Sequence, residues 1–197
     1  LARISAARIL ARSARSSPPP APRSRAPALP AAASGGPPPK APGGCLFYVS
    51  SHGAPQGVLV DKELLPPAIL GRILDETCGD KPTVVVISAC FSGVFIPDLA
   101  EPNRMVLTAA RPDRTSFGCG EDDKYPFFDD CFLQSIRTTS TFPALAEATR
   151  ACVSRREAEE GMKPPSGPQL WLGATLGAVL PLYAFTPPRV SLRRPSP

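Results

Sequence analysis

The chain has 197 residues, enough for one ordinary domain, and 27 of them are prolines. Its formal net charge of +5 is unevenly distributed, because residues 1–44 carry +7 and the remaining residues carry −2. The part of the chain with core-forming patterns is therefore slightly acidic, which excludes a nucleic-acid-binding domain.

Residues 1–44 show no pattern of regular structure. Residues 1–17 are rich in Arg, Ala and Ser and contain no acid. This composition is typical of an amphipathic transit-type leader or of translated GC-rich sequence upstream of the domain, in which case the segment is not genuine. Residues 18–44 are rich in Pro, Ala and Gly and cannot bury enough apolar surface to fold. We therefore predict a disordered basic leader at 1–44, a folded domain at 45–186 and a disordered tail at 187–197.

The first half of the folded domain predicts strands that alternate with a helix. Apolar runs at 45–51 and 57–61 predict two strands, and leucines and isoleucines at helical spacing predict a helix over 62–77. The runs 83–89 and 103–110 lack polar alternation, as strands do when both faces of a parallel sheet are covered. The pattern predicts an α/β domain with a mostly parallel sheet.

The second half predicts a polar loop at 111–126 and helices at 127–139 and 143–159. An apolar tract at 170–185 has 16 residues, including two glycines and a proline. A membrane-spanning helix needs about 18–20 apolar residues. We therefore predict a buried terminal strand followed by a turn, and no membrane partner.

A histidine and a cysteine follow two of the predicted strands. The first strand runs into His52-Gly53, and the strand at 83–89 runs into Cys90. Ligands bind at the carboxyl ends of parallel strands, so both side chains share one rim if the strands are neighbours. A thiolate can attack a carbonyl, and a histidine can protonate the leaving amine. Either residue alone is more often structural, and the joint pattern is the specific signal.

Two other classes of nucleophilic enzyme do not fit the residues around Cys90. A cysteine-dependent phosphatase needs an arginine shortly after its cysteine, and residues 91–96 contain none. An α/β-hydrolase needs glycines two positions before and after its nucleophile, where this chain has Ser88 and Ser92. We therefore predict a cysteine-type endopeptidase.

We interpret the six cysteines as unpaired thiols. They form no Cys-x-x-Cys pair and there is one histidine, so we predict no metal site. The chain is too long and too apolar for a disulfide-stapled mini-domain. Cys119 and Cys131 are close enough in sequence to suggest a disulfide, but we predict none there. Free cysteines favour a reducing, cytoplasmic compartment.

These motifs resemble the legumain-type cysteine peptidases, which share one fold clan with the caspases. LFYVSSHG (46–53) and VVVISACFSG (84–93) carry the resemblance. RMVLTAARPDRTSFGCGEDDKYPFFDD (104–130) and PPSGPQL (164–170) are similar to elements that follow in bacterial members. Asparaginyl endopeptidase and the catalytic subunit of the GPI transamidase are related to this family. The resemblance covers about 45–180 and implies a caspase-like three-layer αβα sandwich with a mostly parallel sheet.

The resemblance also implies roles for individual residues. It makes Cys90 the nucleophile and His52 the general acid and base, with the backbone N–H groups of Gly53 and Cys90 as the oxyanion hole. It places Ser88, Thr115, Ser116 and Asp130 in substrate binding. Asparagine-specific relatives carry an acidic residue at the position of Ser88, so asparagine specificity is not expected. The alternative for Asp130 is a solvated carboxylate at a helix start.

The upstream region departs from the family. Family members carry at least a strand and a helix before the histidine-bearing strand, whereas residues 1–44 show no strand pattern. We therefore predict that the first strand or strands of the fold are missing and that the peptidase is N-terminally incomplete. The implied partner is a protein or peptide substrate, no cofactor is expected, and the oligomeric state stays open. The alternative function is a catalytically inactive fragment or pseudoenzyme that serves as an interaction module.

Overall fold

The computed structural model describes residues 3–9, 43–120 and 124–187. A central sheet has the strand order β1-β2-β6-β7-β8, in which β2, β6 and β7 run parallel and the flanking strands run antiparallel to them. These strands are β1 (Arg3–Ile9), β2 (Gly44–Ser50), β6 (Thr83–Ser88), β7 (Arg104–Thr108) and β8 (Gln169–Leu172). The predicted strands in 45–51, 83–89 and 103–110 are confirmed.

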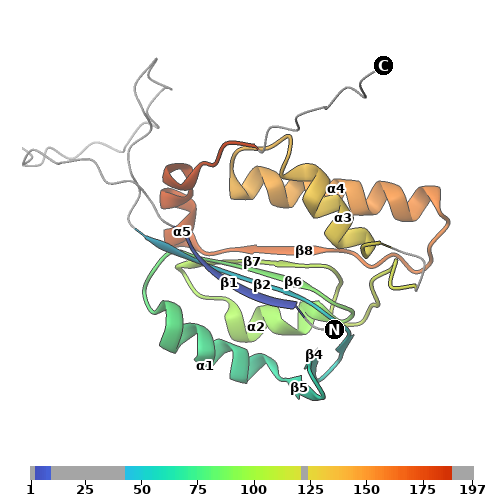
Figure 1. The fold of residues 1–197 in the computed structure, drawn as a ribbon, viewed down its shortest axis with the longest axis horizontal. Coiled ribbons are helices and arrows are strands. Elements are labelled where there is room, and N and C mark those ends of the chain that lie inside the picture. The colour runs from blue at the N-terminus through green and yellow to red at the C-terminus, as the bar shows by residue number, and fades with distance from the viewer. Residues whose placement is uncertain (1–2, 10–42, 121–123, 188–197) are drawn as a thin grey trace, which may run out of the picture.

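Helices cover both faces of this sheet and make three layers (Figure 1). One face carries α1 (Pro67–Cys78), η1 (Ser92–Phe95) and α2 (Ile96–Leu99), and the other carries α3 (Phe127–Ser135) and α4 (Phe142–Glu159). The chain continues from β8 into α5 (Ala174–Val179) and η2 (Leu180–Tyr183). A small antiparallel sheet is formed by β3 (Gly53–Ala54), β4 (Gly57–Val60) and β5 (Glu63–Leu65). The predicted α/β sandwich with a mostly parallel core is confirmed.

The core explains why the run at 83–89 lacks alternation. Every residue of β6 is buried. Val85 and Ile87 pack in the cluster on the α1 side, whereas Val84 and Val86 pack in the cluster on the α3 and α4 side. Because successive side chains point to opposite faces of a strand, both faces of β6 require apolar residues.

The helix predicted over 62–77 starts later than expected. Residues Glu63–Leu65 form β5 instead, and α1 begins at Pro67. A proline fits the first position of a helix, but it disfavours helical backbone in the residue before it. The Pro66-Pro67 pair therefore separates strand from helix, although the leucines at 64 and 65 fit the helical spacing.

The apolar tract at 170–185 forms an edge strand and short helices. Trp171 and Leu172 in β8 are 39% and 41% exposed, so the prediction of a buried terminal strand is wrong. Within the described residues β8 pairs with β7 alone, so it is an edge strand of the central sheet. Within the described residues, none of the helices combines the length and the apolar character needed to cross a bilayer.

The N-terminal segment contains a strand that the composition did not predict. Residues Arg3–Ile9 form β1, which pairs antiparallel with β2 from Arg3 opposite Ser50 to Ile9 opposite Gly44. The prediction of disorder is therefore wrong for this stretch. Residues 10–42 and 188–197, which hold most of the predicted leader and tail, lie outside the described residues.

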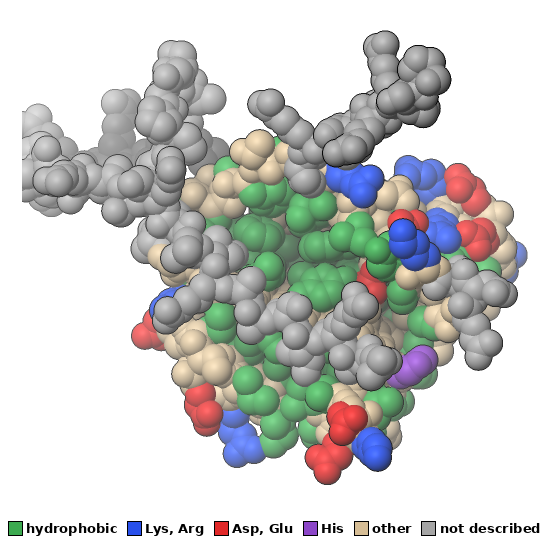
Figure 2. Space-filling model, viewed as in Figure 1, with side chains coloured by type: hydrophobic (Ala, Val, Ile, Leu, Met, Phe, Trp, Pro, Cys, Tyr) green, Lys and Arg blue, Asp and Glu red, His purple; other side chains and the backbone are tan. Residues whose placement is uncertain are grey.

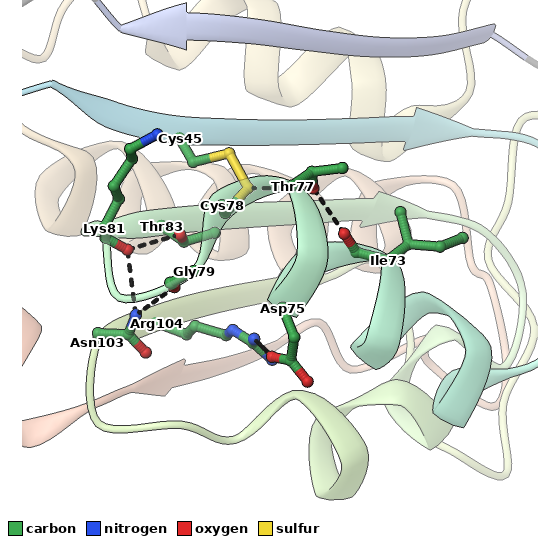
Figure 3. The surroundings of a disulfide bond; sticks show 10 residues. All are labelled: Cys45, Ile73, Asp75, Thr77, Cys78, Gly79, Lys81, Thr83, Asn103 and Arg104. Atoms are coloured by element: carbon green, nitrogen blue, oxygen red, sulfur yellow. Dashed lines mark hydrogen bonds and ion pairs between the residues drawn. A yellow bond between two sulfur atoms is a disulfide. The ribbon is translucent and has the colours of Figure 1, made fainter.

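Four of the six cysteines form disulfides, which corrects the prediction of unpaired thiols. Cys45 bonds to Cys78 with the Cα atoms 5.8 Å apart, and Cys131 bonds to Cys152 with the Cα atoms 5.6 Å apart. The first bond joins the start of β2 to the end of α1 (Figure 3). Sequence separations of 33 and 21 residues hide both pairs from a local pattern search. The prediction of a cytoplasmic location thereby loses its premise.

Candidate active site

The parallel pairing of β2 with β6 brings the histidine and the cysteine to the same edge. Ser50, the last residue of β2, lies opposite Ser88, the last residue of β6. One more hydrogen bond follows, from the Ser51 N–H to the Ser88 carbonyl oxygen at 3.0 Å. His52 and Cys90 each stand two residues beyond the Ser50–Ser88 pair. The carboxyl ends of these strands meet the small sheet at one end of the molecule (Figure 1).

The backbone of the two segments is in contact. A Cβ atom at Gly53 would lie 2.0 Å from the Cys90 carbonyl oxygen and 3.0 Å from the Ala89 Cβ. No side chain fits there, so the glycine is what allows the histidine-bearing segment to approach the cysteine. The strand register brings the two predicted catalytic positions to the same edge, and this close approach shows that their main chains touch.

Cys90 sits at a sharp turn and its sulfur faces a loop. The Ser116 N–H donates to Cys90 Sγ at 3.3 Å, and the Ser116 Oγ lies 3.6 Å from the same sulfur. The next residue, Phe91, has φ 58° and ψ 11°, a left-handed conformation that costs about 1–2 kcal/mol outside glycine. The Phe91 N–H donates to the Arg114 carbonyl oxygen at 2.7 Å, which helps to hold this turn.

His52 extends from a firmly held backbone into an exposed position. Its carbonyl oxygen accepts the Leu59 N–H at 2.9 Å, and the Ser51 hydroxyl donates to the Leu59 carbonyl oxygen at 2.6 Å. Its side chain is exposed, and the histidine is visible in purple at the surface in Figure 2. The small sheet therefore fixes the main chain while the imidazole faces solvent.

A cavity of about 220 Å³ lies beside the histidine. Residues from the end of β2 form one wall, and the loop before α3 forms the other. The lining residues are Ser50, Ser51, His52, Gly118, Cys119, Gly120 and Pro126. Gly118 has a positive φ of 78°, and a Cβ there would meet the Phe127 ring at 2.4 Å, so the loop can close on α3 only with glycine at this position.

The predicted substrate-binding residues lie in different surroundings. Ser116 contacts the sulfur of Cys90, and Ser88 is buried at the end of β6 next to the site. Thr115 is exposed in the same loop as Ser116. Asp130 accepts hydrogen bonds from Gln134 at 2.9 Å and from Arg156 at 3.0 Å, so the printed partners of its carboxylate lie on α3 and α4.

The neighbouring Asp129, which sequence reasoning missed, reaches the histidine-bearing strand. Its carboxylate accepts hydrogen bonds from the Tyr48 hydroxyl and the Ser50 hydroxyl. Burial and the nearby Asp129 charge raise the pKa of Tyr48, so the phenol stays protonated and donates. Alternation along β2 places Tyr48 and Ser50 on the α3 face, but no sequence signal fixes which acid of α3 meets them.

A comparison with known families found a match. The family model described as the Peptidase C13 family, the legumain family, matches residues 44–151, more than half of the chain. The chain belongs to the Peptidase C13 family. Members of this family are cysteine peptidases, which hydrolyse peptide bonds. A search of curated proteins found no match to the chain.

The matched region of this Peptidase C13 chain runs from β2 into α4 and includes both His52 and Cys90. Within the described residues, no group of three or more His, Cys, Asp and Glu side chains is placed to hold a metal ion.

Proposed function

We propose that this chain is a cysteine endopeptidase in which Cys90 is the nucleophile and His52 is the general acid and base. The observation that carries the proposal is the contact of Gly53 with the Cys90 main chain at the end of two parallel strands. Two further features support it. Cys90 lies outside both disulfides, and the exposed His52 lines a cavity at the same edge.

The reaction proceeds through an acyl-enzyme. His52 accepts the thiol proton as Cys90 Sγ attacks the carbonyl carbon of the scissile peptide bond. His52 then donates that proton to the leaving amine, and the C–N bond breaks. Water, deprotonated by His52, attacks the thioester carbonyl carbon. The C–S bond breaks, and His52 returns the proton to the Cys90 sulfur, which leaves the carboxylate product and the free thiol. The N–H groups of Gly53 and Cys90 are proposed to stabilise the oxyanion in both halves.

The substrate is a protein or peptide, held by residues around the sulfur. Ser116 is the strongest candidate among the predicted substrate-binding residues, because its backbone N–H contacts Cys90 Sγ. Ser88, Thr115 and Asp130 stay predictions from the family resemblance. A non-acidic residue at Ser88 supports a preference other than asparagine at the cleavage site.

A non-catalytic interaction module is the second candidate, and one observation favours it. The hydrogen bonds of Cys90 Sγ within the described residues go to Ser116, and the His52 side chain is exposed. Catalytic hydrogen bonds are often loose without substrate and tighten in the Michaelis complex, so this resting geometry is also compatible with a peptidase.

The test is turnover of a mixed peptide library by the full chain, with enough reductant to keep Cys90 reduced but too little to open the disulfides. Wild type, Cys90→Ala, His52→Ala and the control Ser154→Ala, an exposed position of α4, are compared after urea unfolding confirms that each is folded. We expect Cys90→Ala to lose activity on the order of 10⁴-fold or more, and Ser154→Ala to match wild type. If folded wild type and Cys90→Ala are equally silent, the interaction module is the better description.

A further inference from the structure

The buried carboxylate of Asp129 connects α3 to the strand that ends in the histidine. Asp129 lies in the first turn of α3 and is 6% exposed. It accepts one hydrogen bond from Tyr48 and one from Ser50, and both donors belong to β2. A buried carboxylate is expensive unless its oxygens are bonded, and here two hydroxyls and the start of a helix stabilise its charge.

The two hydrogen bonds lead to different parts of the molecule. The rings of Tyr48 and Phe132 of α3 form a T-shaped pair at a centroid distance of 5.5 Å, so the bond from Tyr48 to Asp129 lies in the interior between sheet and helix. Ser50 lines the cavity together with His52. The Ser50 bond therefore holds a wall of the cavity, two residues before the proposed acid and base.

Hydrogen bonds of Ser50 and Ser51 hold the main chain that leads into His52. The Ser51 hydroxyl and N–H are held by Leu59 and Ser88, while the Ser50 hydroxyl is held by Asp129. Ser51 is thus bonded to both sheets, whereas the Ser50 side chain is bonded to α3. Asp129 therefore joins α3 to the end of β2.

We propose that Asp129 is a positioning residue for the peptidase site, which acts through Ser50 on the placement of His52 relative to Cys90. The proposal rests on the proposed function. It assigns the role to Asp129 and leaves Asp130, whose carboxylate binds Arg156 and Gln134, as a separate group. A displaced acid and base costs about 10- to 100-fold in rate, since a shift near 1 Å is enough for the larger value.

The experiment separates the two bonds of the same carboxylate in the full chain. The variants are Ser50→Ala, Tyr48→Phe, Asp129→Asn and the double variant Ser50→Ala/Asp129→Asn. Glu160→Gln, which removes an exposed carboxylate that pairs with Arg156 at 2.9 Å on α4, is the matched control. For each we measure kcat and KM, the rate of Cys90 alkylation by iodoacetamide located by peptide mass spectrometry, and the urea midpoint.

We expect Ser50→Ala and Asp129→Asn to lower kcat about 10- to 100-fold with KM changed less than about threefold. The double variant loses no more than the worse single variant, because both substitutions act on the same Ser50–Asp129 bond. Tyr48→Phe lowers the urea midpoint and keeps kcat, and Glu160→Gln changes neither. Alkylation of Cys90 slows in Ser50→Ala, Asp129→Asn and His52→Ala alike.

Additive losses in the double variant, or an Asp129→Asn variant that loses only stability, would overturn the proposal. Failure of the peptidase function itself looks different, because then wild type has no turnover. Alkylation still decides the positioning role in that case. Equal Cys90 alkylation rates in wild type and Asp129→Asn overturn it, and a slower rate in Asp129→Asn supports it.

Discussion

The two ends of the parallel strands are built in opposite ways. At the amino ends, the Cys45–Cys78 disulfide joins β2 to α1, and the Asn103 amide donates to the carbonyl oxygens of Gly79 at 3.2 Å and Lys81 at 3.1 Å (Figure 3). At the carboxyl ends, the chain turns sharply at Phe91 and the exposed His52 lines a cavity.

The difference shows how one sheet serves stability and chemistry at separate places. Cross-links at the amino ends hold helix and strands together. The carboxyl ends, by contrast, bring the free cysteine, the histidine-bearing segment and a backbone in a costly conformation to one edge of the sheet. We therefore expect changes at the amino ends to affect unfolding and changes at the carboxyl ends to affect activity.

Removal of the disulfide at the amino ends should have the largest effect on stability. Loop-closure entropy predicts that Cys45→Ala/Cys78→Ala lowers the free energy of unfolding by about 3–4 kcal/mol. The kcat of the folded fraction should stay within about twofold of wild type, because the bond lies at the far end of β2 from His52. Urea unfolding and peptide turnover measure the two quantities. A large loss of kcat in fully folded protein would contradict the separation of the two ends.

Gly53→Ala should disturb the carboxyl ends. Its Cβ would overlap the Cys90 carbonyl oxygen at 2.0 Å, so backbone must move, at a cost of about 1–3 kcal/mol together with a loss of kcat/KM. Gly177→Ala in α5 is the matched control, because its Cβ meets nothing closer than 3.9 Å. Alanine is favoured over glycine in a helix, so the control should gain about 0.5–1 kcal/mol. Equal effects of the two substitutions on turnover would show that the Gly53 contact is not needed.

The raised pKa of Tyr48, near the carboxyl end of β2, predicts that the free energy of unfolding falls at alkaline pH. Burial and the Asp129 carboxylate raise its pKa in the folded state above the ordinary value near 10. The contribution of the protonated Tyr48 phenol to the free energy of unfolding is therefore present below about pH 10. It falls above that pH, by up to about 1.4 kcal/mol per pH unit. Urea unfolding of wild type and Tyr48→Phe from pH 8 to pH 11 measures the difference. The wild-type advantage should shrink with rising pH, and a constant advantage would count against the shift.

Asn103→Ala should have the smallest effect, again at the amino ends. It removes the two amide hydrogen bonds to Gly79 and Lys81, which are exposed, so we expect a loss of about 0.5–1 kcal/mol. Peptide turnover should not change. The urea midpoint and kcat measured on one preparation test both statements, and a change in kcat would mean that the amino ends influence the site.

The fold was largely predictable because its central strands have an unambiguous signature. The β-branched run at 83–89 needs apolar side chains packed against both of its faces, and every residue of β6 is buried. The start of α1 was not predictable from helical spacing, since Leu64 and Leu65 fit that period and lie in β5. The strand at 3–9 was missed because its pairing with β2 depends on residues more than 30 positions away.

The site was predictable in part for a related reason. His52-Gly53 and Cys90 follow strands whose ends any parallel pairing brings together, and the order of the motifs adds the family resemblance. Asp129 was not predictable, because adjacent acids in the first turn of a helix point in different directions and sequence does not say which one meets the sheet. The predicted substrate-binding roles of Ser88, Thr115 and Asp130 stay predictions.

The sequence by itself determined the α/β class, the order of most elements and the positions of the histidine and the cysteine, because local periodicity and strand ends encode them. Tertiary structure decided which cysteines are bonded, which carboxylate reaches β2 and which strands lie at the edges of the sheet. Those contacts join residues far apart in the chain, and they depend on how helices rotate and dock on the sheet, which no local pattern of side chains specifies.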